Sequence, residues 1–385
     1  DMFLDESILF KNRNKYPTLR IEEDESELSV NFSDVEEVQE ASVEYVFDLF
    51  AQAKPGDEVL LPAEKITLPN LRLDKPLTIR GVPGTLLEIE NGPIVLEMKQ
   101  EYINDVIIIC ECIISYQNHS ESLSLEAPST GALFLICNDT RAEFRDCQIS
   151  SKVDLSTKDL CFSMNTGRGQ SSSLEYRSSL MIKSCIISGF YEVLNCGVNS
   201  SVVVEKSVFS QCKNHGIKLE NPRAFRMTQS RIEKARKCAV TVKWRKLAEE
   251  PNYRSQLKSV EIDSSELYSC GEYGILIRGE EECQYNLDIT INKNKINSNQ
   301  KDGFTIRSIA ISSLEFTNNT VINNQGSSVS LHKVHYWNSD CPKFEITRCK
   351  LSYSVMGYGV LCYDTIVTFD ANEVMYNHLG GIYIW

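Results

Sequence analysis

A nine-residue pattern recurs ten times between residues 107 and 375, and it limits this chain to a repetitive β fold. The pattern reads apolar, any, apolar, any, any, small or turn-forming, any, apolar, polar. Alternation with period two predicts a strand with one buried face. The sixth position predicts a bend, because Asn and Ser tolerate the left-handed conformation. The second apolar position reads Ile109, Phe144, Ile182, Val204, Met227, Ile262, Ile291, Phe316, Ile346 and Phe369. The turn position reads Cys112, Cys147, Cys185, Ser207, Ser230, Ser265, Asn294, Asn319, Cys349 and Asn372.

A further short strand, usually introduced by glycine, follows most copies of the pattern, as at residues 216–219 and 274–277. Successive turn positions lie 22 to 38 residues apart, which fits one three-sided coil with loops of varying length. A single coil cannot bury its apolar face, whereas stacked coils bury a continuous core. An antiparallel sandwich would need regular hairpin turns of the Asn-Gly type, and these are scarce. The sequence therefore predicts an all-β chain, a right-handed parallel β-helix (solenoid) of about 10–12 coils.

The ends of the chain differ from the repeat. Apolar residues at helical spacing, including Val43, Val46, Phe47 and Phe50, predict an N-terminal capping α-helix over the first coil. We therefore divide the chain into an acidic leader at residues 1–33, a capping helix at 34–54 and the β-helix at 55–385. No second cap is visible in the sequence, so we expect the C-terminal end of the β-helix to be open or continued.

Charge and cysteine content narrow the class of protein. The formal net charge of −13 predicts repulsion of nucleic acid and of anionic lipid, and no apolar run reaches the length of about 18 residues that a membrane span needs. The 14 cysteines are spread through apolar and turn positions, which favours buried reduced thiols over a disulfide framework. We predict a cytoplasmic protein without a cofactor, and with neither a nucleic-acid nor a membrane partner.

Two segments near the N-terminus carry a resemblance to a known family. Residues 47–59 (FDLFAQAKPGDEV) and 74–81 (DKPLTIRG) resemble the first coil of CASH-type β-helices, which are carbohydrate-binding proteins and sugar hydrolases. Over residues 40–385 the chain is most similar to the SHC SH2-domain-binding protein and Nessun Dorma group, and next to the β-helical F-box proteins. The resemblance implies cytoskeletal or cytokinesis adaptors, some with glycan binding. Fold likeness does not by itself transfer chemistry.

Candidate catalytic carboxylates are weak. Sugar-cleaving β-helices need carboxylates that face one another from neighbouring coils. Glu315 and Glu345 fall on adjacent coils in the outward column between the first two apolar positions. No basic or aromatic residue joins them in that column, so two solvated surface carboxylates are the favoured interpretation. We predict no catalytic residue and no enzymatic activity; if the chain is an enzyme, a polysaccharide lyase or glycoside hydrolase is expected.

Three further motifs are short. Residues 214–218, with His215, resemble an element of polygalacturonase-like enzymes, and residues 272–275, with Tyr273, resemble epimerase-type β-helices for four residues. His332, His335 and Cys341 have zinc-ligand chemistry but lie in one irregular loop without a fourth ligand. We therefore interpret His215 as a turn residue and predict no metal site.

Four insertions fall at the same corner of the repeat, after the glycine-led strand, at residues 165–179, 243–256, 278–286 and 332–342. Loops gathered on one edge of a solenoid are frequent binding elements, and aromatic residues and Arg dominate interface hot spots. The alternative is that these aromatics hold their own loops against the rod. The candidate binding edge comprises Tyr176, Arg177, Trp244, Arg245, Tyr253, Arg254, Tyr285, Tyr336 and Trp337.

These observations together predict a non-catalytic scaffold or adaptor that binds protein partners as part of a larger assembly. A cytoskeletal setting is expected, such as a spindle, midbody or axoneme. The first alternative is a glycan-binding or polysaccharide-cleaving β-helix, with a glycan as the partner. The second is a substrate receptor of a ubiquitin ligase, although no F-box helices are visible in the sequence.

Overall fold

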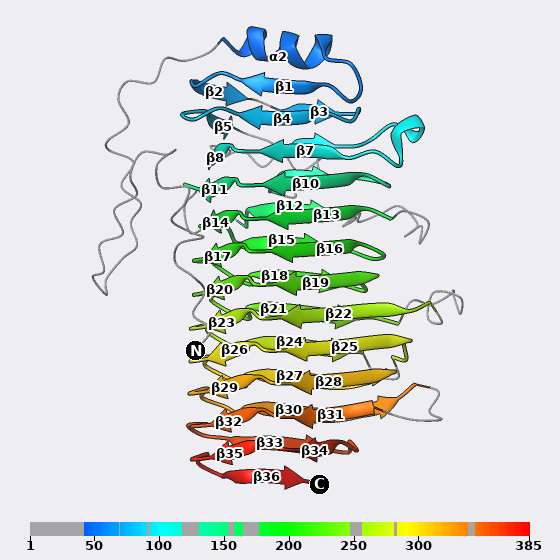
Figure 1. The fold of residues 1–385 in the computed structure, drawn as a ribbon, viewed down its shortest axis with the longest axis vertical. Helices are drawn as coiled ribbons and strands as arrows, with labels where there is room; N and C mark the ends of the chain where they lie inside the picture. Colours follow the sequence, from blue (N-terminus) through cyan, green and yellow to red (C-terminus); the bar gives the residue numbers. More distant parts are fainter. Residues whose placement is uncertain are drawn as a thin grey trace, which may run out of the picture.

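The protein is a rod of stacked three-sided coils. The computed structural model describes residues 42–68, 70–90, 93–117, 131–152, 158–164, 177–246, 256–280, 283–337 and 343–385. Within these residues the chain forms three parallel sheets of 12 strands each, and each coil adds one strand to each sheet (Figure 1). The predicted right-handed parallel β-helix, its coil number and the all-β fold class are confirmed.

The three sheets are named here by the order in which the chain reaches them. The first sheet comprises β1 (Glu58–Leu61), β4 (Thr78–Gly81), β7 (Ile107–Cys110), β10 (Arg141–Arg145), β13 (Ser179–Lys183), β16 (Ser201–Glu205), β19 (Ala224–Thr228), β22 (Lys258–Asp263), β25 (Leu287–Asn292), β28 (Ser313–Thr317), β31 (Lys343–Thr347) and β34 (Thr368–Asp370). The second sheet comprises β2 (Lys65–Leu68), β5 (Leu86–Glu90), β8 (Ile113–Gln117), β11 (Gln148–Ser151), β14 (Ile186–Ser188), β17 (Val208–Ser210), β20 (Arg231–Glu233), β23 (Glu266–Tyr268), β26 (Lys295–Asn297), β29 (Thr320–Ile322), β32 (Lys350–Ser352) and β35 (Glu373–Met375). The third sheet comprises β3 (Leu71–Leu73), β6 (Ile94–Leu96), β9 (Ala132–Ile136), β12 (Leu160–Met164), β15 (Glu192–Cys196), β18 (Ile217–Glu220), β21 (Val240–Trp244), β24 (Ile275–Gly279), β27 (Phe304–Ile311), β30 (Val329–Tyr336), β33 (Tyr358–Tyr363) and β36 (Gly380–Ile384).

The core is a continuous column of apolar side chains inside the coils. Ile182 pairs in register with Val204, and Val204 pairs with Met227, on successive strands of the first sheet. All three side chains are fully buried. Because the rungs of a parallel sheet stand about 4.8 Å apart, each side chain packs directly on the next. The nine-residue pattern therefore supplies two sheets, and the glycine-led strand supplies the third.

The corner between the first and second sheets differs from the prediction in one detail. The left-handed conformation is adopted by the residue before the turn position, as at Ser184 (φ 53°), Lys206 (φ 49°) and Gln229 (φ 48°). The prediction that the turn position itself is left-handed is therefore wrong. The turn position needs a small polar side chain for another reason, which is hydrogen bonding inside the rod.

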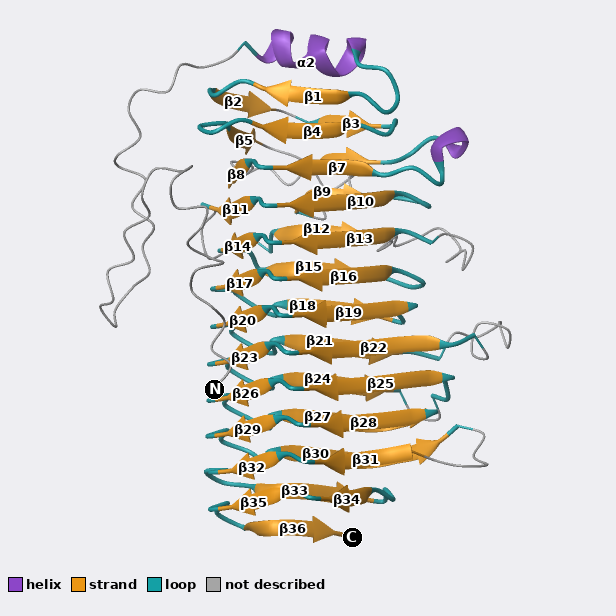
Figure 2. Cartoon of the chain, viewed as in Figure 1, coloured by secondary structure: helices purple, strands orange, loops and turns teal. Residues whose placement is uncertain are grey.

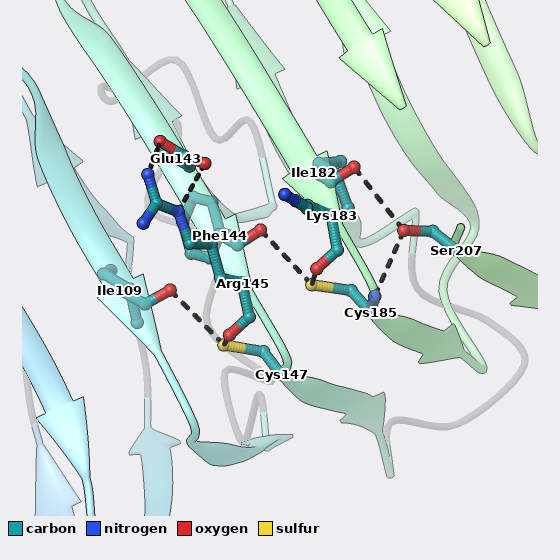
Figure 3. Close-up of polar contacts among 9 residues, drawn as sticks. All are labelled: Ile109, Glu143, Phe144, Arg145, Cys147, Ile182, Lys183, Cys185 and Ser207. Carbon is teal, nitrogen blue, oxygen red and sulfur yellow. Dashed lines mark hydrogen bonds and ion pairs between the residues drawn. The ribbon is translucent and has the colours of Figure 1, made fainter. Parts of the chain in front are cut away.

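Cys185 and Ser207 show this bonding between neighbouring coils (Figure 3). Cys185 Sγ lies 3.5 Å from the carbonyl oxygen of Phe144 and 3.3 Å from that of Lys183. The Cys185 backbone N–H donates to Ser207 Oγ at 3.1 Å, and Ser207 Oγ–H lies 3.5 Å from the carbonyl oxygen of Ile182. A buried backbone group without a partner is costly, so this column of Cys, Ser and Asn satisfies the backbone where the chain bends. All 13 described cysteines are free thiols.

One helix covers the first coil. Helix α2 (Val43–Gln52) lies across the end of the rod that is blue in Figure 1, and it is the longer of the two helices drawn in Figure 2. Its side chains Val46 and Phe50 are buried against the core, and Phe47 packs at the edge of it. A short 3-10 helix (Gln100–Tyr102) lies in a connection farther along the chain. Residues 1–41 lie outside the described residues, so the acidic leader and the boundary at residue 34 stay predictions.

The far end of the rod is formed by β34, β35 and β36. The apolar side chains of Ile382, Ile384 and Trp385 are exposed there. Within the described residues, no helix is long and apolar enough to cross a membrane.

Candidate functional site

The four insertions lie between a strand of the third sheet and a strand of the first sheet, which is the shared corner that the repeat predicted. Trp244 and Tyr285, however, are not on the surface of that corner. Trp244 is fully buried and Tyr285 is 1% exposed; their rings are tilted against each other with centroids 4.8 Å apart. The Tyr285 hydroxyl donates to the Arg245 carbonyl oxygen. These two aromatics hold the loop bases against the rod, so their assignment to a binding edge is wrong.

The other residues of the candidate edge have varied positions. Arg177 is exposed, and the Arg245 guanidinium forms ion pairs with Glu220 at 2.7 Å and with Glu280 at 3.7 Å. Tyr336 packs on Phe344 with ring centroids 4.1 Å apart and donates its hydroxyl to the Ile366 carbonyl oxygen at 3.0 Å. Trp337 is half-buried. Tyr176, Tyr253 and Arg254 lie outside the described residues.

The carboxylate pair on the first sheet is present as a pair of neighbours. Glu315 of β28 and Glu345 of β31 are register partners, and both side chains are half-buried. The next positions along this column are Thr290 and Thr368. The neighbours on either side of the two carboxylates are therefore neither cationic nor aromatic, and this part of the column offers a sugar few groups to bind.

The zinc motif does not assemble within the part of the chain that the structure describes. His332 and His335 both lie on β30, but His335 contacts Asp364 at 3.8 Å. No group of three or more His, Cys, Asp or Glu side chains that could hold a metal is found among the described residues. Cys341 lies outside them.

A richer arrangement lies on the outward face of the third sheet. Five consecutive strands place a cation or an aromatic ring at the same outward position, and register pairing aligns them from coil to coil. Neighbouring members are therefore about 4.8 Å apart along the rod. We call this set the cationic column; it comprises Lys243 of β21, Arg278 of β24, Arg307 of β27, His332 of β30 and Tyr363 of β33.

Arg307 is held at the centre of the column by groups from two sides. Its guanidinium lies 3.7 Å from the Asp302 carboxylate and 5.3 Å from the centroid of the Tyr273 ring. Asp302 is fixed in turn, because it accepts hydrogen bonds from Thr305 Oγ1 at 2.9 Å and from the Ser327 backbone N–H at 2.8 Å. The Arg307 side chain is 41% exposed, so it is accessible to an oxyanion. Its Nε is buried and has no hydrogen-bond partner within the described residues.

His332 is the next member of the column. Its Nε2 lies 2.7 Å from Ser330 Oγ, and its ring is tilted on Tyr363 with centroids 6.2 Å apart. Partial burial lowers the pKa of His332, the positive charge of Arg307 lowers it further, and Asp302 opposes them. The imidazole is therefore mostly neutral near pH 7. When Nε2 carries the ring proton and donates it to Ser330, the lone pair on Nδ1 can act as a base.

Aromatic rings lie beside His332 towards the end of the rod. Tyr363 packs on Trp385 in a tilted arrangement with ring centroids 4.4 Å apart, and Tyr358 stacks on Tyr383 at 5.1 Å. Such rings present flat apolar surface with a polar edge, which suits the faces of sugar rings. A cation, a neutral imidazole and aromatic rings therefore follow one another along a single face.

Sequence reasoning missed this face because it compared only one outward column, that of the first sheet. A signal was present in the sequence. A glycine, or an Ala or Ser in its place, introduces the third strand of each coil. Four positions after it stand Lys243, Arg278, Arg307, His332 and Tyr363. These residues align when positions are counted from the start of the third strand of each coil, whereas the comparison covered only positions within the nine-residue pattern.

No protein-family model matches the sequence, and no curated protein matches it. Among solved structures, the chain is similar to the periplasmic alginate epimerase AlgG, with a TM-score of 0.50 and 12% identity over 88% of this chain and 83% of that one. A mutant of AlgG gives a TM-score of 0.51 and 11% identity over 87% and 80%. The A-module of the Azotobacter vinelandii mannuronan C-5 epimerase AlgE6 gives 0.44 and 10% over 89% and 93%. At these identities the likeness establishes the fold alone.

These comparisons correct the functional prediction. The AlgG structures that share the fold over at least four-fifths of both chains are polysaccharide-active enzymes, and a cytoskeletal adaptor finds no support among them. The prediction of a non-catalytic protein-binding scaffold is therefore wrong, and so is the prediction that the chain is not an enzyme. The findings back the glycan-acting alternative better than the scaffold. The ubiquitin-ligase receptor stays a prediction.

Proposed function

We propose that the chain acts on an acidic polysaccharide, which it binds on the outward face of the third sheet. The observation that carries this proposal is the cationic column, in which the partly exposed Arg307 is the register partner of a neutral His332. An arginine beside a neutral imidazole can bind a carboxylate and accept a proton from the adjacent carbon. The similarity to alginate epimerases supports the same substrate class.

The geometry suits proton abstraction next to a uronate carboxylate. The Arg307 guanidinium binds the carboxylate, and the lone pair on His332 Nδ1 takes the proton from the adjacent ring carbon. The C–H electron pair moves into the carboxylate, where Arg307 stabilises the added charge. Donation of a proton from water to the opposite face of the carbon gives the epimer, and the hydroxide that remains takes the proton from His332. Alternatively, the neighbouring glycosidic oxygen leaves with the proton from His332, which breaks the chain and leaves a double bond.

The resemblance of residues 47–59 and 74–81 to the first coil of CASH-type β-helices also supports a glycan as the ligand. The finer assignment to the SHC SH2-domain-binding protein and Nessun Dorma group stays a prediction, and so does the cytoplasmic location. Neither is needed for the proposed chemistry.

A panel of polysaccharides tests the proposal. Polymannuronate, polygalacturonate, a sulfated glycan and a neutral glucan are offered to the protein, and binding is measured by calorimetry. Epimers are detected by NMR and new double bonds by ultraviolet absorbance. We expect binding and turnover with a uronate polymer and neither with the neutral glucan.

Two variants connect any turnover to the cationic column. His332→Gln should lower kcat by at least about 100-fold, because general-base catalysis contributes about that much, while KM changes little. Arg307→Gln should raise KM as well as lower kcat. Glu315→Gln on the first sheet is the matched control and should behave as wild type. Binding of the neutral glucan alone, or full turnover by His332→Gln, would contradict the proposal.

A further inference from the structure

A second group of polar side chains surrounds His215 at the corner between the second and third sheets. His215 precedes β18, and its Nδ1 accepts a hydrogen bond from the Cys238 backbone N–H at 3.3 Å. Because Nδ1 is the acceptor, the ring proton of the neutral imidazole lies on Nε2. Nε2–H is then a hydrogen-bond donor.

The charges that lower the pKa of His215 are positive. Burial, together with the charges of Lys237, Lys218 and Arg278, lowers the pKa of His215 to about 4. The imidazole is therefore neutral near pH 7 and stands among three cations. These cations come from three successive coils, since Lys218 lies on β18, Lys237 precedes β21 and Arg278 lies on β24.

The cations near His215 outnumber the carboxylates that could neutralise them. Lys218 lies 3.8 Å from Glu192, whose carboxylate also accepts a hydrogen bond from Asn214 Nδ2 at 2.5 Å. Within the residues that the structure describes, no carboxylate lies within ion-pair distance of Lys237 or of Arg278. A neutral donor beside two unpaired cations is a suitable site for an oxyanion.

The position of this group relates it to the cationic column. Arg278 is shared by the two groups, because it is also a member of the cationic column and the register partner of Arg307. From β18 to β30 the third sheet advances by four rungs through β21, β24 and β27, which is about 19 Å at 4.8 Å per rung. One extended anionic chain can therefore contact both groups only if it runs along the rod axis.

We infer that His215 and Lys237, together with Arg278 of the cationic column, form a second oxyanion-binding site for another carboxylate of the same polymer, which lies parallel to the rod axis. This inference rests on the proposed function, because it assigns a further contact to the same substrate. It makes affinity depend on ligand length, since a chain that reaches both sites gains the second contact at high effective concentration.

Oligouronates of increasing length test the inference by calorimetry. For the wild type we expect affinity to rise by about tenfold between oligomers too short to span the two sites and oligomers long enough to do so. Lys237→Gln and, separately, His215→Gln should reduce that gain to about threefold or less and leave the affinity for short oligomers unchanged. Lys183→Gln removes one exposed charge on the first sheet and should keep the full gain.

The possible outcomes separate this inference from the proposed function. If no uronate oligomer of any length binds the wild type, the proposed function fails. If short oligomers bind but the length gain is absent, or is kept in both Lys237→Gln and His215→Gln, only the second site is disproved. In the second arm, the ligand is a sulfated oligosaccharide of equal length that has no uronate residues. Its binding with the same length gain would show that the site accepts any oxyanion rather than a carboxylate.

Discussion

Trp244 illustrates how a single side chain can belong to the rod rather than to a ligand. The indole is fully buried, packs against the ring of Tyr285, and lies at the base of the loop that follows β21. Aromatic residues bury large apolar areas, so a loop that must leave and rejoin the rod benefits from such an anchor. Trp244 and Tyr285 therefore contribute to stability rather than to recognition.

Trp244→Ala should lower the free energy of unfolding by about 3–5 kcal/mol, because removal of a buried Trp leaves a large cavity. Chemical denaturation measures this change. Tyr45→Ala on the exposed side of helix α2 is the control, and a change within about 0.5 kcal/mol is expected there. Polysaccharide affinity under native conditions should stay at the wild-type value. Loss of polysaccharide affinity with unchanged stability would contradict this and show that Trp244 contributes to ligand binding.

His215 makes stability depend on pH. Its pKa is lowered from 6.5 to about 4 in the folded protein, so folding favours the neutral ring. This contribution is fully present above pH 6.5 and is lost as the pH falls from 6.5 towards 4. The difference in pKa corresponds to roughly 3 kcal/mol.

His215→Gln should remove this pH-dependent contribution. Urea unfolding of wild type and variant at pH 7 and pH 4 measures it, and the stability difference between the two proteins should change by roughly 3 kcal/mol in favour of the variant at pH 4. Carboxylates titrate in both proteins and cancel in the difference. Parallel pH profiles would show that the ring is not held neutral.

At the scale of the element, hydrogen bonds between neighbouring coils at the corner of the first and second sheets explain why Asn, Ser and Cys all occur at the turn position. Asn319 Oδ1 accepts from the Asn294 backbone N–H at 2.9 Å, and Asn319 Nδ2 donates to the Ile291 carbonyl oxygen at 2.8 Å. Ser207 uses one hydroxyl for the equivalent bonds to Cys185 and Ile182. The position requires a short side chain with a polar atom, and several residue types satisfy it.

Asn319→Ala should lower the free energy of unfolding by about 2–4 kcal/mol, because it leaves two buried backbone groups unpaired. Asn319→Ser is the matched control, since a hydroxyl restores part of the bonding, and its loss should be about half as large. Equal losses in the two variants, measured by urea unfolding, would mean that volume rather than hydrogen bonding decides the residue at this corner.

For the whole molecule, the net charge of −13 does not exclude a local column of cations. The strands of the third sheet align Lys243, Arg278 and Arg307 on successive coils. A local field near such a column attracts an anion even though the protein as a whole is acidic. Net charge alone is therefore a poor guide to the sign of the ligand that this rod binds.

Affinity for a uronate polymer should fall as salt rises from about 50 mM to about 500 mM, because exposed charges are screened over a shorter distance. Calorimetric titrations across this range measure the effect, and Arg307→Gln should flatten the salt dependence. Affinity that does not change with salt would indicate that aromatic stacking, rather than charge, holds the ligand.

The architecture and most of the core were determined by the sequence by itself. Residues such as Ile182, Val204 and Met227 recur at positions that only stacked coils can bury together, so periodicity alone specifies three sheets and their register. Local periodicity carries this information because each coil repeats the same environment. The capping role of Val46 and Phe50 follows from helical spacing in the same way.

The site was decided only by the tertiary structure. Lys243, Arg278, Arg307 and His332 are separated along the chain by loops of unequal length, and parallel pairing of the third sheet brings them into one column. Burial of Trp244, the neutral state of His332 and the cations around His215 depend on neighbours from other coils. A pattern within one coil cannot specify such contacts, because pKa and exposure depend on what the adjacent coils place alongside.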